Sequence, residues 1–371
     1  MKGFFRPFEL VLRHGFVYPF LRLLFHNPPR PEPVDLRKIK KVLILRYDRI
    51  GDIIVTTPIF RALKSAAPDL VLGVLASPSN SELIRYDRHV DRLHVLHSSW
   101  LKLAKELLAA RKEGYDVVLN FIFNRTTSGG ILANLIAPRG IKIGQGAEKY
   151  RFYFNRLLRL DRGQKHMVEI LAGYVEEVFG ISVRRDNLTF RVALRDKERR
   201  GVSLFLERHQ TKAGANDFVL LNISATDKIR RLGKRQATHI LDILLNRLKV
   251  FTIVISSPQD ERWRRELVEF FKPHRVPSFP EQGSATLREI AALVERSFFV
   301  ITPDTSIIHL ASAMNKPVLG LFTPLQVTAE WMPWKVKHAA IVADAGQPVA
   351  SIPLDRIEQE LTTFAKGIIS T

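Results

Sequence analysis

The chain has 371 residues, of which 46% are hydrophobic, so it is long enough for two domains with large cores. It contains no cysteine, which excludes disulfide bonds, zinc–cysteine sites and thiol catalysis, and which fits a reducing compartment. Lys and Arg number 57 and exceed the 37 Asp and Glu by 20. An excess of this size indicates an anionic partner, such as a nucleic acid, an anionic membrane surface or a phosphorylated substrate.

Residues 1–40 form the first predicted segment and combine basic side chains with aromatic ones. Arginines interrupt the apolar windows, and no run approaches the roughly 20 apolar residues of a membrane-spanning helix. Two interpretations are open. The segment lies in the interface of an anionic membrane, with its aromatic side chains among the headgroups, or it folds back over a domain surface. The proline-rich stretch NPPRPEP at 27–33 is predicted to be a stiff tether to the first strand.

From residue 41 the chain alternates short apolar runs with helical stretches, a pattern typical of βαβ units and a parallel sheet. Strands are predicted at 41–46, 70–77 and 115–121. Helices are predicted at 57–68, 100–114 and 167–180. These elements predict an N-terminal Rossmann-like domain over residues 41–185.

The same alternation begins again near residue 217, after a region of lower order whose part 186–216 is predicted to be an interdomain linker. Strands are predicted at 217–224, 250–257, 298–304 and 316–324, and helices at 237–248, 287–297 and 306–315. A second Rossmann-like domain is therefore expected over 217–350, followed by a C-terminal segment, 351–371, with a helix at 355–368. The predicted fold class is α/β, with two doubly wound domains facing each other across a cleft.

An acidic motif follows a strand in each half of the chain. Asp48 and Asp52 flank Gly51 in RYDRIGD (46–52), and Asp304 follows a strand of the second half. Ligands of doubly wound sheets bind beyond the carboxyl ends of the strands, so both motifs are expected at the cleft. Asp52 is either a helix N-cap or a carboxylate that takes a proton from a hydroxyl group. Gly51 is expected in a tight turn or where the backbone approaches a ligand.

The stretch TPDTSIIHLASAMNKP (302–317) leads from a strand into a helix through Thr305 and Ser306. Free N–H groups at a helix start favour phosphate. The alternative is an ordinary cap, with His309 a core histidine whose hydrogen bonds are satisfied.

Two further stretches follow strands of the second half. TDKIRRLGKR (226–235) contains Lys228, Arg230 and Arg231, which are suited to phosphate oxygens; the alternative is a solvated basic face. SSPQDERW (256–263) contains Asp260, which could be a ligand for ribose hydroxyls; the alternative is a capping role for Asp260 or Glu261.

Together these stretches resemble the ADP-heptose:lipopolysaccharide heptosyltransferase family, glycosyltransferase family 9. The resemblance rests on VLILRYDRIGDIIVTTPIFRALK near the start and ITPDTSIIHLASAMNKPVLGLFTP near the end. His166, NISATDKIRRL and EWMPW add weaker agreement, and the resemblance covers about residues 41–345. It implies a GT-B fold and transfer of a sugar, with inversion, from an ADP-activated donor, without a required metal or a cofactor.

The resemblance also implies roles for particular residues. Asp52 would be the base for the acceptor hydroxyl, and Arg230 or Arg231 would stabilise the leaving diphosphate. The predicted donor-binding residues are Asp304, Thr305, Ser306, His309, Lys228, Arg231 and Asp260. Those predicted on the acceptor side are Arg46, Asp48 and Gly51. The acceptor would be lipopolysaccharide core or a related glycolipid, and the protein would be cytoplasmic and peripheral on the inner face of the inner membrane.

The chain departs from the family pattern around the expected donor site. Ser306 stands where the family commonly has Gly, Ile223-Ser224 replaces Pro-Gly, and RRLG (230–233) replaces Lys-Arg-Trp-Pro. These departures leave the donor sugar open and keep a catalytically degenerate GT-B binding module as the alternative. A nucleic-acid partner is not expected, because the basic residues are dispersed. A nicotinamide oxidoreductase is disfavoured, because G-x-G-x-x-G is missing.

Overall fold

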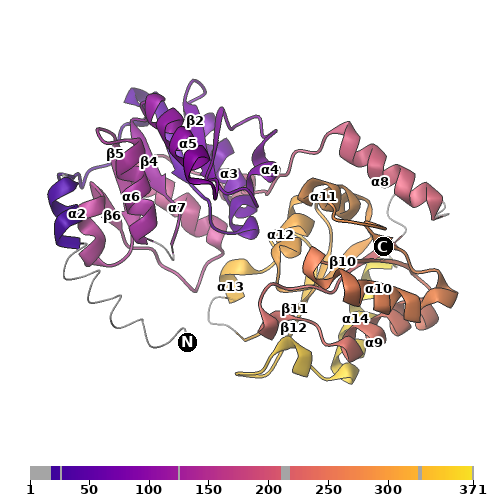
Figure 1. Cartoon of the computed structure of the whole chain (residues 1–371). Coiled ribbons are helices and arrows are strands. Elements are labelled where there is room, and N and C mark those ends of the chain that lie inside the picture. The colour runs from indigo at the N-terminus through magenta and orange to yellow at the C-terminus, as the bar shows by residue number, and fades with distance from the viewer. Residues whose placement is uncertain (1–17, 26, 124–125, 210–217, 325–327, 370–371) are drawn as a thin grey trace.

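The fold consists of two α/β domains, each built on one six-stranded parallel sheet (Figure 1). The computed structural model describes residues 18–25, 27–123, 126–209, 218–324 and 328–369. The strand order is β3-β2-β1-β4-β5-β6 in the first sheet and β12-β11-β10-β7-β8-β9 in the second. Counted within its own domain, the second sheet has the same order as the first, and this is the order of a Rossmann sheet. The predicted α/β class with two doubly wound domains is confirmed.

The first domain buries its sheet between two layers of helices. Its strands are β1 (Lys41–Leu45), β2 (Val71–Ala76), β3 (Arg92–Val95), β4 (Val117–Asn120), β5 (Ile141–Gln145) and β6 (Arg156–Leu158). Its helices are α2 (Tyr18–Leu24), α3 (Ile50–Ala66), α4 (Ser81–Ile84), α5 (Trp100–Lys112), α6 (Thr126–Ile136) and α7 (Met167–Phe179), with a 3₁₀ helix η3 (Glu148–Tyr153). In β1, Val42 and Ile44 face the core beneath α3 and α7, whereas Leu43 and Leu45 face the core beneath α5 and α6. A strand covered on both faces is apolar throughout, which is why the sequence revealed it.

The second domain repeats this arrangement. Its strands are β7 (Phe218–Asn222), β8 (Phe251–Ile255), β9 (Ser278–Phe279), β10 (Phe299–Pro303), β11 (Val318–Phe322) and β12 (His338–Val342). Its helices are α9 (Lys234–Asp242), α10 (Glu261–Phe270), α11 (Leu287–Arg296), α12 (Ser306–Ala313), α13 (Thr328–Trp331) and α14 (Leu354–Ile369). The core on one face contains residues of α9, α10 and α14, and the core on the other contains residues of α11 and α12.

The helix after β1 begins earlier than the sequence predicted. α3 starts at Ile50 rather than Thr57, although Pro58 lies inside it. The Thr57 hydroxyl donates to the Ile54 carbonyl at 2.7 Å, so this carbonyl has a partner where Pro58 has no N–H to offer. Asp52 consequently lies in the first turn and the N-cap is Arg49. The interpretation of Asp52 as an N-cap is therefore wrong.

One expectation for a connecting segment is also wrong. The region of lower order contains α8 (Asp196–Arg208), a 13-residue helix that packs beside α11. The stretch 27–33, predicted as a stiff tether to the first strand, is hydrogen-bonded to the first domain. The Asn27 amide donates to Asn134 Oδ1 at 2.9 Å, and the Arg30 N–H donates to the Asn155 carbonyl at 2.9 Å. Of the segment 1–40, residues 1–17 and residue 26 lie outside the described residues.

The two domains meet where α3 packs against α12. A Cβ atom added to Gly51 in α3 would stand 2.6 Å from Cδ2 of His309 in α12. Gly51 thus permits the close approach of two helices. This replaces the expectation of a tight turn or an approach to ligand.

We expect Gly51→Ala to lower the free energy of unfolding by about 1–3 kcal/mol, because the added methyl overlaps the His309 ring. Chemical denaturation measures the change. Gly201→Ala in α8 is the matched control, since its added methyl meets no atom within 4 Å. His309→Ala removes the ring that the added methyl overlaps. In the His309→Ala background, Gly51→Ala should therefore lower the free energy of unfolding much less than in the natural chain. An equal cost in both backgrounds would contradict the packing role.

Candidate active site

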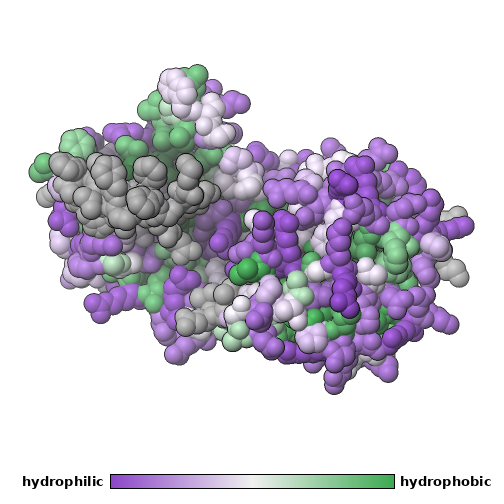
Figure 2. Space-filling view, turned by 60° about the horizontal axis from the view of Figure 1, so that its bottom comes forward, coloured by the Kyte–Doolittle hydropathy of each residue, from purple (hydrophilic) through white to green (hydrophobic). Residues whose placement is uncertain are grey.

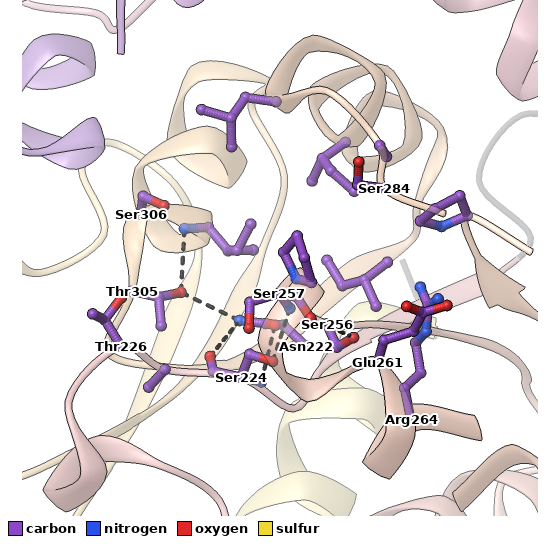
Figure 3. Close-up of a pocket in the computed structure, with 18 of the residues that line it drawn as sticks. Asn222, Ser224, Thr226, Ser256, Ser257, Glu261, Arg264, Ser284, Thr305 and Ser306 are labelled. Atoms are coloured by element: carbon purple, nitrogen blue, oxygen red, sulfur yellow. Dashed lines mark hydrogen bonds between the residues drawn. The ribbon is translucent and has the colours of Figure 1, made fainter. Parts of the chain in front are cut away.

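A pocket of about 230 Å³ lies at the carboxyl ends of β7 and β8 and at the start of α12 (Figure 3). Most of its lining belongs to the second domain, and Ile50 of α3 contributes from the first. Its polar lining includes Asn222, Ser224, Thr226, Ser256, Ser257, Thr305 and Ser306. The pocket therefore lies where ligands of doubly wound sheets bind, next to the facing domain.

Asn222 organises one wall of this pocket. Its side-chain amide donates to the hydroxyl of Thr302 at 2.9 Å and to that of Thr305 at 3.3 Å, and its carbonyl accepts from the Ser224 N–H at 3.2 Å. The Ser257 N–H donates to the Ser224 hydroxyl at 2.9 Å, which connects the ends of β7 and β8. Sequence reasoning missed Asn222, and the available signal was a polar residue ending the apolar run FVLLN.

The start of α12 is presented to the pocket. The Thr305 side chain caps the helix by accepting from the Ile307 N–H at 3.3 Å, and Ser306 and Ile307 line the pocket. The first N–H groups of a helix favour anions, so this end of the pocket suits a phosphate group.

Asp304 forms an ion pair with Arg230, at 2.9 Å between Oδ2 and Nη1. Burial raises the pKa of Asp304 above its ordinary value, while the charges of Arg230 and Arg49 oppose this rise. Because Asp304 lies just before α12, the ion pair holds the Arg230 guanidinium close to the start of that helix.

The other basic residues of 228–231 are arranged differently. Lys228 is exposed. Arg231 binds the Ala225 carbonyl through Nε at 2.9 Å and lies 3.5 Å from the Asp260 carboxylate. The Ser257 hydroxyl donates to Asp260 at 3.0 Å, so Asp260 holds loop residues together. The neighbouring Glu261 lines the pocket instead.

The facing edge of the first domain contains a buried charge cluster. Arg46 is completely buried and lies 3.0 Å from Asp52 Oδ1 and 3.2 Å from Asp48 Oδ2. Burial raises the pKa of Asp52 to about 6, and the Asp48 charge adds to the rise. The positive charges of Arg46, Arg49 and Arg162 act in the opposite direction. A carboxylate with a pKa near 6 is ionised at neutral pH and still basic enough to accept a proton.

Arg49 is electrostatically close to the carboxylates of both domains, since its charge favours the ionised forms of Asp52 and Asp304. A second arginine, Arg162, also favours ionised Asp52, and it crosses to the other domain. Its guanidinium binds the completely buried Glu330 at 2.8 Å and 3.2 Å, and Glu330 also accepts from the Gly163 N–H at 2.7 Å. Arg162 therefore joins α13 of the second domain to the Asp52 cluster.

Two histidines at the domain interface are uncharged. Burial lowers the pKa of His309 to about 3 and that of His166 to about 4. His166 caps α7 and binds the Met332 carbonyl at 3.0 Å through Nε2. His309 lies against Gly51 and is not part of the pocket lining. Its Nδ1 has no hydrogen-bond partner among the described residues, so the expectation of a fully satisfied core histidine is wrong.

No group of three or more His, Asp or Glu side chains among the described residues is arranged to hold a metal ion. No described helix combines the length and the apolar character needed to cross a bilayer.

Residues 100–352 match the sequence profile of glycosyltransferase family 9 (heptosyltransferase). The chain belongs to this family. It is 22% identical to lipopolysaccharide heptosyltransferase 3 of Escherichia coli over 301 residues, which are 76% of this chain and 83% of that protein. Its fold is similar to that of a family 9 glycosyl transferase from Veillonella parvula, with a TM-score of 0.76, 18% identity, and 91% and 99% of the two chains covered. Escherichia coli heptosyltransferase WaaC, solved with ADP-2-deoxy-2-fluoro heptose, aligns with a TM-score of 0.67, 17% identity, and 87% and 99% coverage.

In this family 9 glycosyltransferase the predicted site residues fall into three groups. Thr305 and Ser306 line the pocket. Arg46, Asp48 and Asp52 form one cluster, and Arg230 and Asp304 form a pair. The remaining predicted residues are not in the pocket lining, although Arg231 and Asp260 bind the lining residues Ala225 and Ser257. The catalytic or binding role of each residue stays a prediction.

The buried Glu330 should matter for the stability of the glycosyltransferase. Glu330→Gln removes a charge that binds Arg162 and Gly163, so we expect the free energy of unfolding to fall by roughly 1–3 kcal/mol. Denaturant titration tests this. Glu295→Gln removes a partner from the surface pair with Arg199, at 2.9 Å, and should change stability little. Equal effects of the two substitutions would contradict the interdomain role.

Proposed function

We propose that this enzyme transfers a sugar, with heptose as the first candidate, from an ADP-activated donor to a lipopolysaccharide core or related glycolipid acceptor. The observation that carries the proposal is the position of Ile50. This residue lines the donor-side pocket, and Asp52 follows it in the same helical turn. A nucleotide sugar bound in the pocket would thus have a buried carboxylate of the facing domain close to its sugar. The names of family 9 relatives supply the donor and acceptor classes.

The pocket offers different groups to the different parts of such a donor. Ile255, Leu287 and Ile290 give it an apolar wall suited to a base. The Glu261 carboxylate can accept hydrogen bonds from ribose hydroxyls. The diphosphate would lie at the start of α12, where N–H groups and Arg230 offset its charge.

The proposed reaction is a single displacement. Asp52 accepts the proton of the acceptor hydroxyl while that oxygen bonds to the anomeric carbon of the sugar. The bond from this carbon to the diphosphate oxygen breaks on the opposite side, which inverts the configuration. Arg230 and the α12 N–H groups stabilise the negative charge that develops on the departing diphosphate. Fixed cationic and N–H groups thus carry the leaving-group role in this proposal, without a required metal ion.

A glycolipid acceptor implies work at a membrane surface. The excess of 20 basic residues supports an anionic surface as partner. We therefore place the enzyme on the cytoplasmic face of the inner membrane, as a peripheral protein. A binding module without turnover is the alternative, since Ser306 and the 230–233 stretch depart from the family pattern.

Asp52→Asn should lower turnover by about 10²–10⁴-fold, because the amide cannot accept the proton. Calorimetric titration with ADP-heptose, other nucleotide sugars and NAD should give selective binding of one ADP-sugar that the substitution leaves unchanged. Asp69→Asn, at an exposed position before β2, is the matched control and should keep full turnover. Near-normal turnover in Asp52→Asn would overturn the base assignment, and donor binding without turnover in the natural chain would favour the binding module.

The pH dependence of kcat/KM should contain an acid limb with a midpoint near 6, the pKa of Asp52. A base acts in its ionised form, so activity should be constant above this value and fall tenfold per pH unit below it. Initial rates between about pH 5 and 8 test this. The absence of a limb between about pH 5 and 7 would contradict ionised Asp52 as the required form.

A further inference from the structure

The face of the first domain that is turned away from the domain contact carries a concentration of exposed apolar side chains. Eleven large hydrophobic side chains are exposed among the described residues, and seven of them belong to α2, α5 and α6. These seven are Phe20, Leu23, Leu24, Trp100, Leu101, Leu108 and Leu135. Leu23 is 86% exposed and Trp100 is 74% exposed, so they contribute little to the core. Figure 2 shows the second domain's lobe, on the right, mostly covered by hydrophilic side chains.

Hydrogen bonds join these three helices through α6, and we call their outer surface the α2–α5–α6 face. The Arg111 side chain of α5 donates to the Leu135 carbonyl of α6 at 3.0 Å. Asn27, just after α2, binds Asn134 of α6 at 2.9 Å. α5 and α6 cover one side of the first sheet, whereas α3, on the other side, contacts the second domain. Among the described residues, the seven apolar side chains remain between 43% and 86% exposed.

The charge on this face is positive. The helices α2, α5 and α6 together with η3 contain seven Lys or Arg and two Glu. In α5, exposed Lys102 and Lys105 stand beside Trp100 and Leu101, and the one acidic residue of that helix, Glu106, is paired with His94 at 2.9 Å. Aromatic and leucine side chains flanked by lysine and arginine are the pattern of helices that lie in the interface of an anionic bilayer.

We propose that the α2–α5–α6 face docks on an anionic lipid bilayer, with Trp100 and Leu101 inserted among the headgroups. The proposal deepens the proposed function, because a lipid-anchored acceptor would be presented at this surface. Trp100 begins α5 shortly after the carboxyl end of β3. It therefore lies on the side of the first domain where the strands of the sheet end, and Asp48 and Asp52 lie on the same side, after β1. The bilayer would then lie at the edge of the first domain from which an acceptor reaches the cleft.

Lipid fits this face better than a second protein copy does. Like charges would oppose each other if two such faces met, since each carries an excess of five positive charges over η3 and the three helices. A bilayer containing acidic lipid offers the opposite charge over its whole surface. Charge complementarity therefore selects the bilayer as occupant.

Vesicle sedimentation with the full chain tests the proposal. Vesicles of phosphatidylcholine with about 30% phosphatidylglycerol should sediment the protein, and pure phosphatidylcholine vesicles should sediment it far less. Trp100→Ser with Leu101→Ser should weaken binding roughly tenfold or more. Leu204→Ser with Phe270→Ser removes two equally exposed apolar side chains elsewhere and should leave binding unchanged.

A charge pair of variants tests the electrostatic part. Lys102→Glu with Lys105→Glu should weaken binding roughly tenfold or more. Lys197→Glu with Arg200→Glu, at the same spacing on exposed positions of α8, should have little effect. Unchanged melting temperatures would show that the variants are folded.

Three results would overturn the proposal. The first is equal vesicle binding by the natural chain and by the variant with Trp100→Ser and Leu101→Ser. The second is loss of vesicle binding only when residues 2–17 are deleted. The third is a chain that binds no lipid but forms a dimer in analytical ultracentrifugation, when the Trp100→Ser and Leu101→Ser variant does not form this dimer. None of these measurements involves a nucleotide sugar. Failure of the membrane proposal is therefore distinguishable from failure of donor binding or turnover.

Discussion

The buried guanidinium of Arg46 is the interaction on which the inner edge of the first domain depends. It binds the Asp52 carboxylate and carbonyl, the Thr56 hydroxyl, the Asp48 carboxylate and the Phe121 carbonyl. These partners belong to the loop after β1, the first turns of α3 and the segment after β4. A fully buried arginine without partners would cost several kcal/mol, so the fold is restricted to arrangements that keep these groups together. The position of Asp52 follows from this constraint.

The second half of the site depends on how the two domains meet. Both sheets have the same strand order, and each brings a strand-end acidic motif to the domain interface. Gly51 against His309 sets the approach of α3 to α12, and Glu330 binds Arg162 across the interface. At α4 the Glu82 carboxylate accepts from the N–H of Leu287, a pocket-lining residue, at 2.6 Å. The pocket is thus shaped by contacts between the domains as well as by the loops of one domain.

The sequence predicted seven strands near the sheet centres, but the four edge strands and the interior strand β5 were missed. A central strand such as β1 is covered on both faces and reads as an uninterrupted apolar run, whereas β3, with the sequence RLHV, lies at an edge and carries Arg92 and His94. Helix α8 was missed because its apolar stripe is narrow within a highly charged stretch. The start of α3 was misplaced because Pro58 resembles a first-turn proline, while the Thr57 hydroxyl makes it tolerable inside the helix.

The residues of the candidate site also divide into those that local sequence features identify and those that depend on distant parts of the chain. Asp52, Asp304 and Thr305 could be singled out because strand ends and helix starts are local features. The pairing of Glu330 with Arg162 joins residues 168 positions apart, and the bond from Asn222 to Thr302 joins residues 80 positions apart. No local pattern in one sequence carries that information.

Asp52 shows how such a site is maintained at a cost to stability. Its pKa rises from 3.8 to about 6, with burial as the largest cause, so the folded state prefers the protonated carboxyl. The unfolded chain releases this proton near pH 4, and the folded chain releases it near 6. The folded state therefore loses about 3 kcal/mol relative to the unfolded state as the pH rises through this interval, and the loss persists at neutral pH. Arg46 limits the loss by pairing with the ionised form, but complete pairing would lower the pKa and weaken Asp52 as the base that we propose. A general base at neutral pH requires an intermediate pKa, which a carboxylate has when burial raises its pKa and partial pairing with a cation limits the rise.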